Sequence, residues 1–189
     1  NSLPSQSPTG ALYVKNGAII EYSNNGIQAE NGFGVIEFSG NSKMQLNGIA
    51  MNLMSSNGGL KLDNSIIDTK FGQHQRQISL YKCPAFINNS KIFGDGQQTG
   101  IFSNYGRLAI VGKSVVHGFN TLIDKEVDLI GQSRFGQIGN SSGLYIDNSD
   151  LLQAVTAIRN RSRSVFVRKC YIDGTVNSVG IASENWLSN

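Results

Sequence analysis

The sequence predicts an all-β fold in which short parallel strands wind into a solenoid of about eight turns, with about three strands in each turn. Three observations lead to this prediction. The composition combines 39% hydrophobic with only 15% charged residues and 22 glycines, which is typical of strands joined by many turns. A small residue, most often preceded by Asn, recurs every 16 to 25 residues. Aliphatic residues keep nearly fixed distances from it, as expected of stacked repeats.

The recurring dipeptide predicts a corner between two strands. Its small residues are Gly17, Ser42, Ser65, Ser90, Ser114, Ser133, Ser149 and Cys170. The residues before them are Asn16, Asn41, Asn64, Asn89, Lys113, Gln132, Asn148 and Lys169. Asn adopts the left-handed backbone conformation more readily than most non-glycine residues. We therefore interpret each dipeptide as a bend of about one residue between two strands.

Apolar residues on both sides of each corner predict a buried interior. Three residues before the small position stand Val14, Leu62, Ile87, Val111, Ile130, Ile146 and Val167, and Phe38 fits if its corner carries one extra residue. Two residues after it stand Ile19, Met44, Ile67, Ile92, Val116, Phe135, Leu151 and Ile172. Equivalent side chains would then stack from one turn to the next along the axis of a solenoid.

A third strand follows a loop of variable length and often begins with Gly-Ile. Its inward residues would be Ile27, Ile49, Ile78, Ile101, Ile123, Ile158 and Ile181, with Ile138 in one shortened turn. The chain of 189 residues fits a single domain. We expect residues 10–189 to form that domain and residues 1–9 to lead into it, the whole being part of a longer protein.

The Asn column, the Ser column and the Gly-Ile strands resemble the right-handed parallel β-helix of pectate-lyase-like proteins and bacteriophage tailspikes. The resemblance extends from about Gly10 to Ile181. It implies a right-handed coil formed by one chain. It does not select a chemistry, because the same coils carry lyases, hydrolases, epimerases and binding proteins.

The outward positions of the first strand are largely apolar, since neighbouring residues of a strand point to opposite faces. The apolar members of this column are Tyr13, Phe86, Ile110, Leu129, Tyr145 and Phe166. A continuous exposed apolar stripe indicates an interface. The tailspikes that the chain resembles are homotrimers of parallel coils, so the resemblance implies a homotrimer that covers this stripe.

The outward positions of the third strand are polar with two aromatic residues, Tyr81 and Phe102. Such a mixture suits sugars, whose hydroxyls form hydrogen bonds and whose C–H faces lie against rings. Arg159 and Arg161 alternate on one strand face and could bind carboxylates of an acidic polysaccharide. We predict that Tyr81, Phe102, Arg159 and Arg161 bind substrate; ion pairing of the arginines with nearby acids is the alternative.

Asp124 and Glu126 are the candidate catalytic residues. Residues i and i+2 of a strand lie roughly 6.6 to 6.8 Å apart, which overlaps the carboxyl separation of inverting glycosidases, about 6.5 to 9.5 Å. One carboxyl would protonate the leaving oxygen and the other would activate water. A solvated acidic edge is the alternative interpretation.

Several functional classes receive no support. The net charge is only +3 and the basic residues are mostly scattered, so nucleic-acid binding is not expected. No apolar run approaches the roughly 18 to 20 residues of a membrane span. Cys83 and Cys170 lack the spacing of a metal site, and phosphate-loop and dinucleotide fingerprints are absent. We expect no metal and no cofactor.

Together, the resemblance, the low charge and the abundance of Asn and Ser favour a segment of a phage tailspike or tail fibre, located in the extracellular virion tail. It would recognise host surface polysaccharide and could depolymerise it. The alternatives are a secreted pectate-lyase-like lyase or hydrolase, and a non-catalytic structural shaft. If the chain is an enzyme, glycoside hydrolysis fits better, since lyases that resemble it use a positively charged base and a metal.

Overall fold

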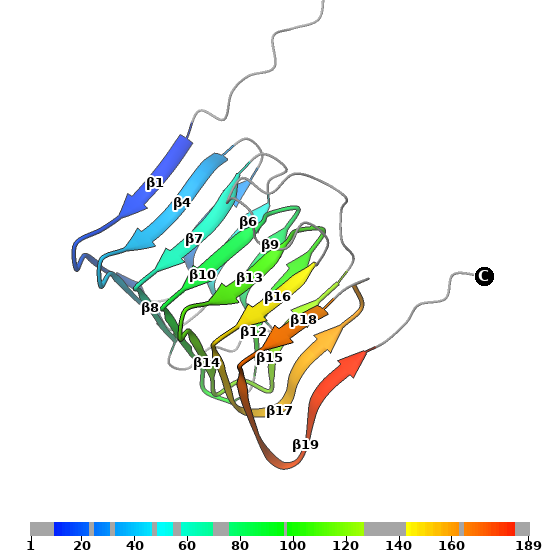
Figure 1. The fold of residues 1–189 in the computed structure, drawn as a ribbon. Coiled ribbons are helices and arrows are strands. Elements are labelled where there is room, and N and C mark those ends of the chain that lie inside the picture. The colour runs from blue at the N-terminus through cyan, green and yellow to red at the C-terminus, as the bar shows by residue number, and fades with distance from the viewer. Residues whose placement is uncertain are drawn as a thin grey trace, which may run out of the picture.

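A computed structural model describes residues 10–22, 25–30, 33–46, 49–54, 58–69, 76–96, 98–126, 143–162 and 165–183. Strands dominate these ranges, and the strand pairs in them are parallel. The predicted all-β parallel solenoid is confirmed (Figure 1). No helix in these ranges is long and apolar enough to cross a membrane.

The first side of the solenoid is a seven-stranded sheet that is seen face-on in Figure 1. Its strands, in spatial order, are β1 (Gly10–Val14), β4 (Phe33–Ser39), β7 (Gly59–Asp63), β10 (Ala85–Asn88), β13 (Leu108–Val111), β16 (Leu144–Asp147) and β18 (Val165–Arg168). Each strand lies one coil further along the chain than its neighbour. Six such steps separate the first strand from the last, so the described chain makes about six turns.

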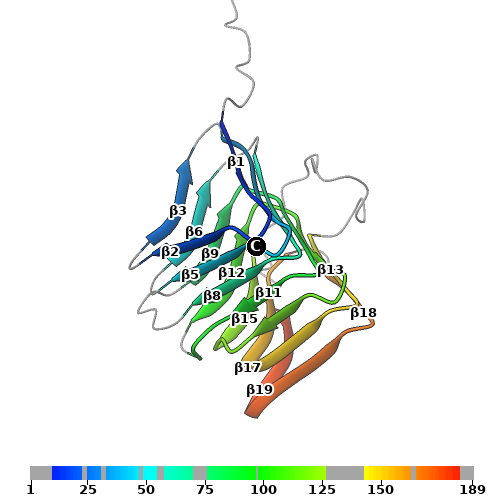
Figure 2. The same ribbon diagram turned by 90° about the vertical axis from the view of Figure 1, so that its left-hand side faces the viewer.

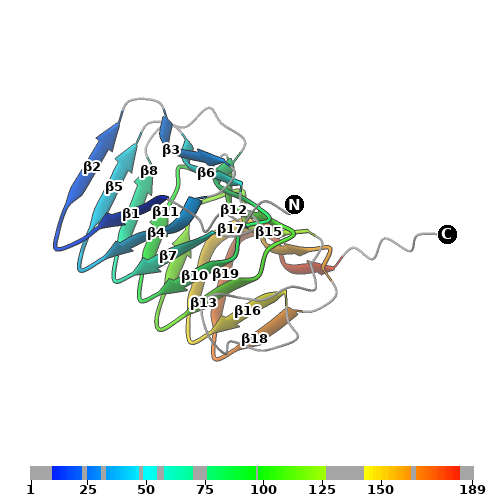
Figure 3. The same cartoon turned by 90° about the horizontal axis from the view of Figure 1, so that it is seen from above.

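The other two sides are ladders that merge at one end (Figures 2 and 3). The second ladder contains β2 (Ile19–Tyr22), β5 (Lys43–Leu46), β8 (Ile66–Thr69), β11 (Lys91–Phe93) and β14 (Val115–His117). The third contains β3 (Asn25–Glu30), β6 (Ile49–Met54), β9 (Arg76–Tyr81), β12 (Thr99–Asn104) and β15 (Thr121–Lys125). The long strand β17 (Asp150–Asn160) pairs with both β14 and β15, and β19 (Tyr171–Ser183) pairs with β17. Three strands per turn therefore hold for the first five coils, after which one long strand replaces two.

One predicted turn falls on residues that the structure does not describe. The residues expected to form it, Ile130, Gln132, Ser133, Phe135 and Ile138, lie outside the described ranges. β13 pairs directly with β16, and β15 pairs directly with β17. The ladders therefore contain no strand between these neighbours, and the structure describes fewer turns than the eight expected.

The corners adopt the predicted backbone conformation. The described residues that precede the predicted small positions all have positive φ, between 44° and 66°: Asn16, Asn41, Asn64, Asn89, Lys113, Asn148 and Lys169. Two lysines share this conformation, so the corner geometry is imposed by the fold and not only by the intrinsic preference of Asn.

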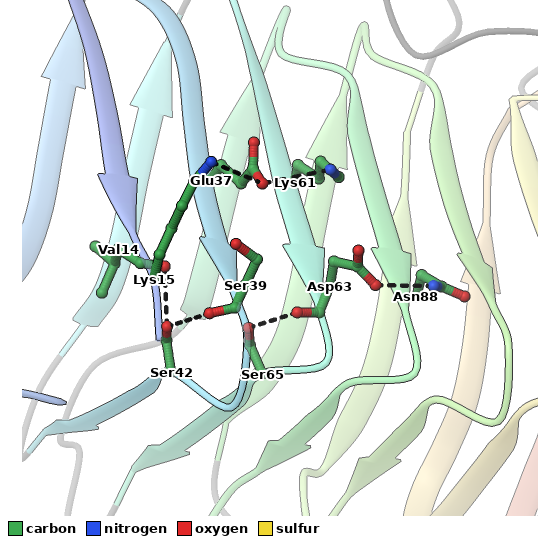
Figure 4. A network of polar contacts seen from close by, with 9 residues as sticks. All are labelled: Val14, Lys15, Glu37, Ser39, Ser42, Lys61, Asp63, Ser65 and Asn88. Carbon is green, nitrogen blue, oxygen red and sulfur yellow. Dashed lines mark hydrogen bonds and ion pairs between the residues drawn. The ribbon is translucent and has the colours of Figure 1, made fainter. Parts of the chain in front are cut away.

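The serines after the corners form a buried polar column. Ser42, Ser65, Ser90, Ser114 and Ser149 are at most 2% exposed. Each hydroxyl donates to a carbonyl at its own corner, for example Ser65 Oγ to the Asp63 oxygen at 3.0 Å. Some of these hydroxyls also accept a hydrogen bond from a backbone N–H of the preceding coil. For example, the Ser65 N–H donates to Ser90 Oγ at 3.1 Å. Figure 4 shows Ser42 and Ser65 in these positions. Buried backbone groups at the corners thus find partners, as burial requires.

Three corners carry one extra residue, which corrects several predicted inward positions. In them, glycine with positive φ accompanies the Asn or Lys: Gly17, Gly40 and Gly112. Phe38 fits the inward column as expected, opposite Leu62. In the corner with Gly112, Ile110 and not Val111 points inward, since it pairs with Ile87 and is fully buried.

The first corner differs from the prediction in the same way. Ala18, not Gly17, occupies the small position, because Lys43 N–H donates to the Ala18 carbonyl as the equivalent residues do in later coils. Ile20 therefore faces the core opposite Met44, while Ile19 is 56% exposed. The extra residue shifts the following strand by one, which exchanges its two faces.

The third ladder follows the prediction with one exception. Its inward column is Ile27, Met51, Ile78, Ile101, Ile123, Ile158 and Ile181. Met51 replaces the expected Ile49, because Gly-Ile marks the beginning of β6 in this coil and the register places Met51 opposite Ile78. Both cysteines are free; Cys83 is buried and Cys170 is partly buried. Burial raises the pKa of the Cys83 thiol to about 12, and Cys170 takes the small position of the last coil.

Adjacent isoleucines in β8 provide a test of the inward register. Ile67 is fully buried in the core, whereas Ile66 is only partly buried on the outer side of the same strand. Ile67→Ala should lower the free energy of unfolding by about 2–5 kcal/mol, because it removes core contacts and leaves a cavity. Ile66→Ala should lower it by less than about 1 kcal/mol. Urea denaturation of the two variants measures both values; equal losses would contradict the register.

Candidate functional site

The six residues predicted to form a site lie on one surface of the solenoid. We call the outer side of β9, β12, β15 and the C-terminal half of β17 the third face. Tyr81 lies in β9, Phe102 in β12 and Asp124 in β15. Glu126 is the first residue after β15. Arg159 lies in β17, and Arg161 directly follows that strand. Four successive coils therefore bring these side chains together.

Two outward columns run along this face. Ser79, Phe102, Asp124 and Arg159 are paired across successive strands. The second column, two residues further along each strand, contains Tyr81 opposite Asn104. It continues to Glu126 and Arg161, because the Glu126 N–H donates to the Ser103 carbonyl and the Arg161 N–H to the Lys125 carbonyl.

The acids and arginines form one cluster. Arg161 Nη1 lies 3.2 Å from Glu126 Oε1 and 3.8 Å from Asp124 Oδ1. Arg159 Nη1 lies 3.9 Å from Asp124 Oδ2. Only the first of these contacts is short enough to be a hydrogen bond. Because β15 and β17 are neighbours, a single coil separates the arginines from the acids.

Phe102 belongs to the outward column, yet its ring is covered. The Arg76 guanidinium carbon lies 3.3 Å from the ring centroid, and Phe102 is only 4% exposed. Arg76 begins β9 and reaches across one coil. A sugar could stack on Phe102 only after Arg76 moved. Arg76 itself was missed by the sequence interpretation, because no local pattern connects it with Phe102.

Tyr81 is the accessible aromatic residue among the six predicted residues. It is 36% exposed, and its ring meets that of Tyr105 edge-on, with centroids 5.7 Å apart. Lys82 Nζ lies 5.7 Å from the centre of the Tyr81 ring. Tyr105 and Lys82 both have positive φ, so they occupy the corner where the third strand ends. The sequence interpretation did not include either of them.

A buried polar layer supports the strand ends beneath the cluster. Lys125 points inward and is fully buried, and its Nζ donates to the Glu126 carbonyl at 3.1 Å. One coil further, the Ser162 N–H donates to Asn160 Oδ1 at 3.1 Å, and Asn160 Nδ2 donates to the Ser162 carbonyl at 3.0 Å. These bonds fix the backbone that carries Glu126 and Arg161.

Two oxygens of this face are buried without a hydrogen-bond partner, Asn104 Oδ1 and Asp124 Oδ1. Asp124 Oδ1 has the long ion pair with Arg161 described above. Among the described residues, no three His, Cys, Asp or Glu side chains converge as they would around a metal ion.

The predicted oligomer stripe is only partly apolar. Its column runs Tyr13, Glu37, Lys61, Phe86, Ala109, Tyr145 and Phe166. Ala109 stands where Ile110 was expected, because of the extra corner residue, and Leu129 lies outside the described ranges. Tyr145 and Phe166 stack with centroids 4.9 Å apart and planes 2° from parallel.

Charged groups border the aromatic part of this column. Glu37 Oε1 lies 3.4 Å from Lys61 Nζ and 3.7 Å from Lys15 Nζ. Figure 4 shows the three side chains together. Burial raises the pKa of Glu37, but the two lysines outweigh burial and the net shift is downward. Arg168 donates from Nε to Asp147 Oδ1 at 3.0 Å, and this contact holds the pKa of Asp147 below its usual range.

Comparisons with protein-family models, curated proteins and solved structures found no match to this chain. The resemblance to tailspikes and pectate lyases therefore stays a prediction beyond the parallel solenoid itself. Since a fold of this kind carries many functions, the function must be argued from the site.

Proposed function

We propose that this protein is a segment of a phage tailspike or tail fibre that binds the surface polysaccharide of the host through the third face. The observation that supports it is the convergence of Tyr81, Asp124, Glu126, Arg159 and Arg161 on neighbouring coils. These groups supply one accessible ring, carboxylate acceptors and guanidinium donors along a continuous surface.

The third face fits a linear glycan better than a small compact ligand. Coils repeat at the spacing of neighbouring strands, about 4.8 Å, so equivalent positions recur along the axis. A polysaccharide lying along this axis would meet Tyr81 first and the charged cluster two to three coils later. Rings bind the C–H faces of sugars, while charged side chains bind hydroxyls and acidic substituents.

The setting in a virion tail is part of the same proposal. The proposed coil is right-handed, because crossover connections between parallel strands are right-handed almost without exception. The protein would act outside the host cell, at the end of the phage tail. A homotrimer would bury the aromatic part of the predicted oligomer stripe on the first side, where the rings of Tyr145 and Phe166 stack in parallel.

Cleavage of the glycan is a second role, favoured by one observation. Asp124 and Glu126 lie two residues apart on one outward face and share Arg161. In this arrangement both carboxylates are occupied by guanidinium groups. Substrate would have to displace Arg161 before either carboxylate could protonate a glycosidic oxygen or activate water.

The first prediction concerns glycan binding. The double variant Arg159→Ala with Arg161→Ala should weaken binding of the recognised polysaccharide at least about tenfold, because it removes charge-assisted hydrogen bonds. Arg168→Ala, which removes an ion-paired arginine from the first side, should leave affinity unchanged. A panel of purified O-antigen and capsular polysaccharides, measured by microarray and then by calorimetry, tests both. Failure of the unaltered protein to bind any of them would refute the proposal.

Hydrolysis is tested separately. If the acids are catalytic, Asp124→Asn with Glu126→Gln should abolish the release of new reducing ends, since amides can neither donate nor accept the required proton. Binding to the same polysaccharide should persist. New reducing ends from the amide variant would remove the two acids from the mechanism, and unsaturated products absorbing in the ultraviolet would identify a lyase.

The oligomer is tested by light scattering. A homotrimer should have three times the 20.4 kDa mass of the chain. Phe166→Lys should shift the mass toward the monomer, because it places an unpaired charge in an apolar contact. Ile19→Lys, a change at another exposed apolar residue, on the second side, serves as the control. A monomeric unaltered protein would contradict the trimer.

A further inference from the structure

Two unpaired acceptors stand out on the third face. Asn104 Oδ1 and Asp124 Oδ1 are inaccessible to solvent and accept no hydrogen bond. Asp124 keeps only about a tenth of its side chain exposed, and its contacts with Arg159 and Arg161 are 3.9 and 3.8 Å long. Those contacts are electrostatic, since hydrogen bonds to oxygen require shorter distances.

The two acceptors are diagonal neighbours. Asn104 ends β12 and lies opposite Glu126, and Asp124 precedes Glu126 by two residues on the same face of β15. One strand spacing and two residues along a strand place their Cα atoms about 8 Å apart. The side chains can approach more closely than this. A single monosaccharide with its hydroxyls spans such a distance.

Orphaned acceptors of this kind are costly to the folded state. A buried polar atom without a partner destabilises the folded state, and most buried polar atoms in native structures are paired. The Asn104 backbone takes part in the ladder, where its carbonyl accepts a hydrogen bond from the Lys82 N–H at 2.8 Å, but its side-chain Oδ1 accepts none. The fold therefore does not explain this side chain.

We propose that Asn104 Oδ1 and Asp124 Oδ1 accept hydrogen bonds from two hydroxyl groups of one bound sugar. This inference rests on the proposed glycan-binding function and deepens it, because it assigns a hydroxyl-reading subsite to Asn104. Arg159 and Arg161 cover Asp124 in the unliganded state. In the proposed complex these side chains, which are 36% and 25% exposed, turn outward so that the hydroxyls reach the carboxylate.

The subsite selects sugars by what they donate. A site that contains buried acceptors discriminates strongly against an analogue that lacks the matching hydroxyl, because the acceptors are then left unpaired. Replacing Asn104 by Leu, which has a similar shape and no acceptor, removes that penalty in both the free and the bound state. The variant should lose selectivity without losing the fold.

The first measurement needs no ligand. Asn104→Leu should raise the melting temperature by about 2 to 4 °C or leave it unchanged, because an orphaned acceptor is removed. Asn52→Leu, at an exposed amide in β6, two coils away in the same ladder, should leave it unchanged. A fall of several degrees in Asn104→Leu alone would mean that the amide has a structural partner, and would overturn the inference.

The second measurement uses defined sugars. The methyl glycosides of glucose, galactose, mannose and rhamnose, and the monodeoxy forms of whichever binds, are titrated by NMR. The unaltered protein should bind at least one deoxy form about tenfold more weakly than its parent. Asn104→Leu should bind the two alike, whereas Asn52→Leu should behave as the unaltered protein does.

The outcomes separate this inference from the proposed function. Binding of polysaccharide with no loss of deoxy discrimination in Asn104→Leu overturns the subsite and leaves the glycan-binding function standing. No binding of any polysaccharide or glycoside refutes both. Titration with sodium, potassium, magnesium and calcium chloride completes the test: saturable stabilisation that Asn104→Leu abolishes would assign the two oxygens to a cation, and would overturn the inference.

Discussion

The structure depends on one constraint, the left-handed corner followed by a buried small residue. The corner turns the chain between two sides of the solenoid and exposes backbone groups to the interior, where water cannot satisfy them. The serine hydroxyl satisfies these groups, since it donates to a carbonyl of its own corner. In addition, Ser90 Oγ accepts from the Ser65 N–H, and Ser114 Oγ accepts from the Ser90 N–H. Because this unit is repeated, the coils superpose. The aliphatic columns and the polar outer faces are both consequences of that superposition.

The sequence predicted the architecture well because the corner is a local signal. Asn64 with Ser65 and Asn89 with Ser90 are recognisable without any knowledge of distant residues, and their backbone and burial agree with the prediction. The failures have local causes too. An extra glycine at the corner moved Ile19 outward and Ile110 inward, since one residue exchanges the two faces of a strand. Nothing in "IVGKS", residues 110–114, indicates which residue is the extra one until the neighbouring strand fixes the register.

The alternation of inward and outward side chains along each strand predicted part of the candidate site. Strand alternation assigned Asp124, Arg159 and Phe102 to one outer column, and the ladder pairing agrees. It could not foresee that Arg76 would cover Phe102, because that contact joins different coils. Alternation also sends Lys125, between Asp124 and Glu126, to the inside of the solenoid, but it could not identify the Glu126 carbonyl as a partner for the buried ammonium group, which burial makes necessary. The ion pairs between the acids and Arg161 required knowledge of which coils are adjacent.

The corners with a supernumerary glycine have a consequence for how such a chain tolerates change in length. At Gly17, Gly40 and Gly112 the added residue is absorbed within the bend, and the strands on either side still meet their partners. An insertion there leaves the coils above and below untouched, unlike an insertion within a strand. Single residues could therefore be gained or lost at the corners during evolution, and the loops before the third side could lengthen, while the inward apolar columns stay aligned.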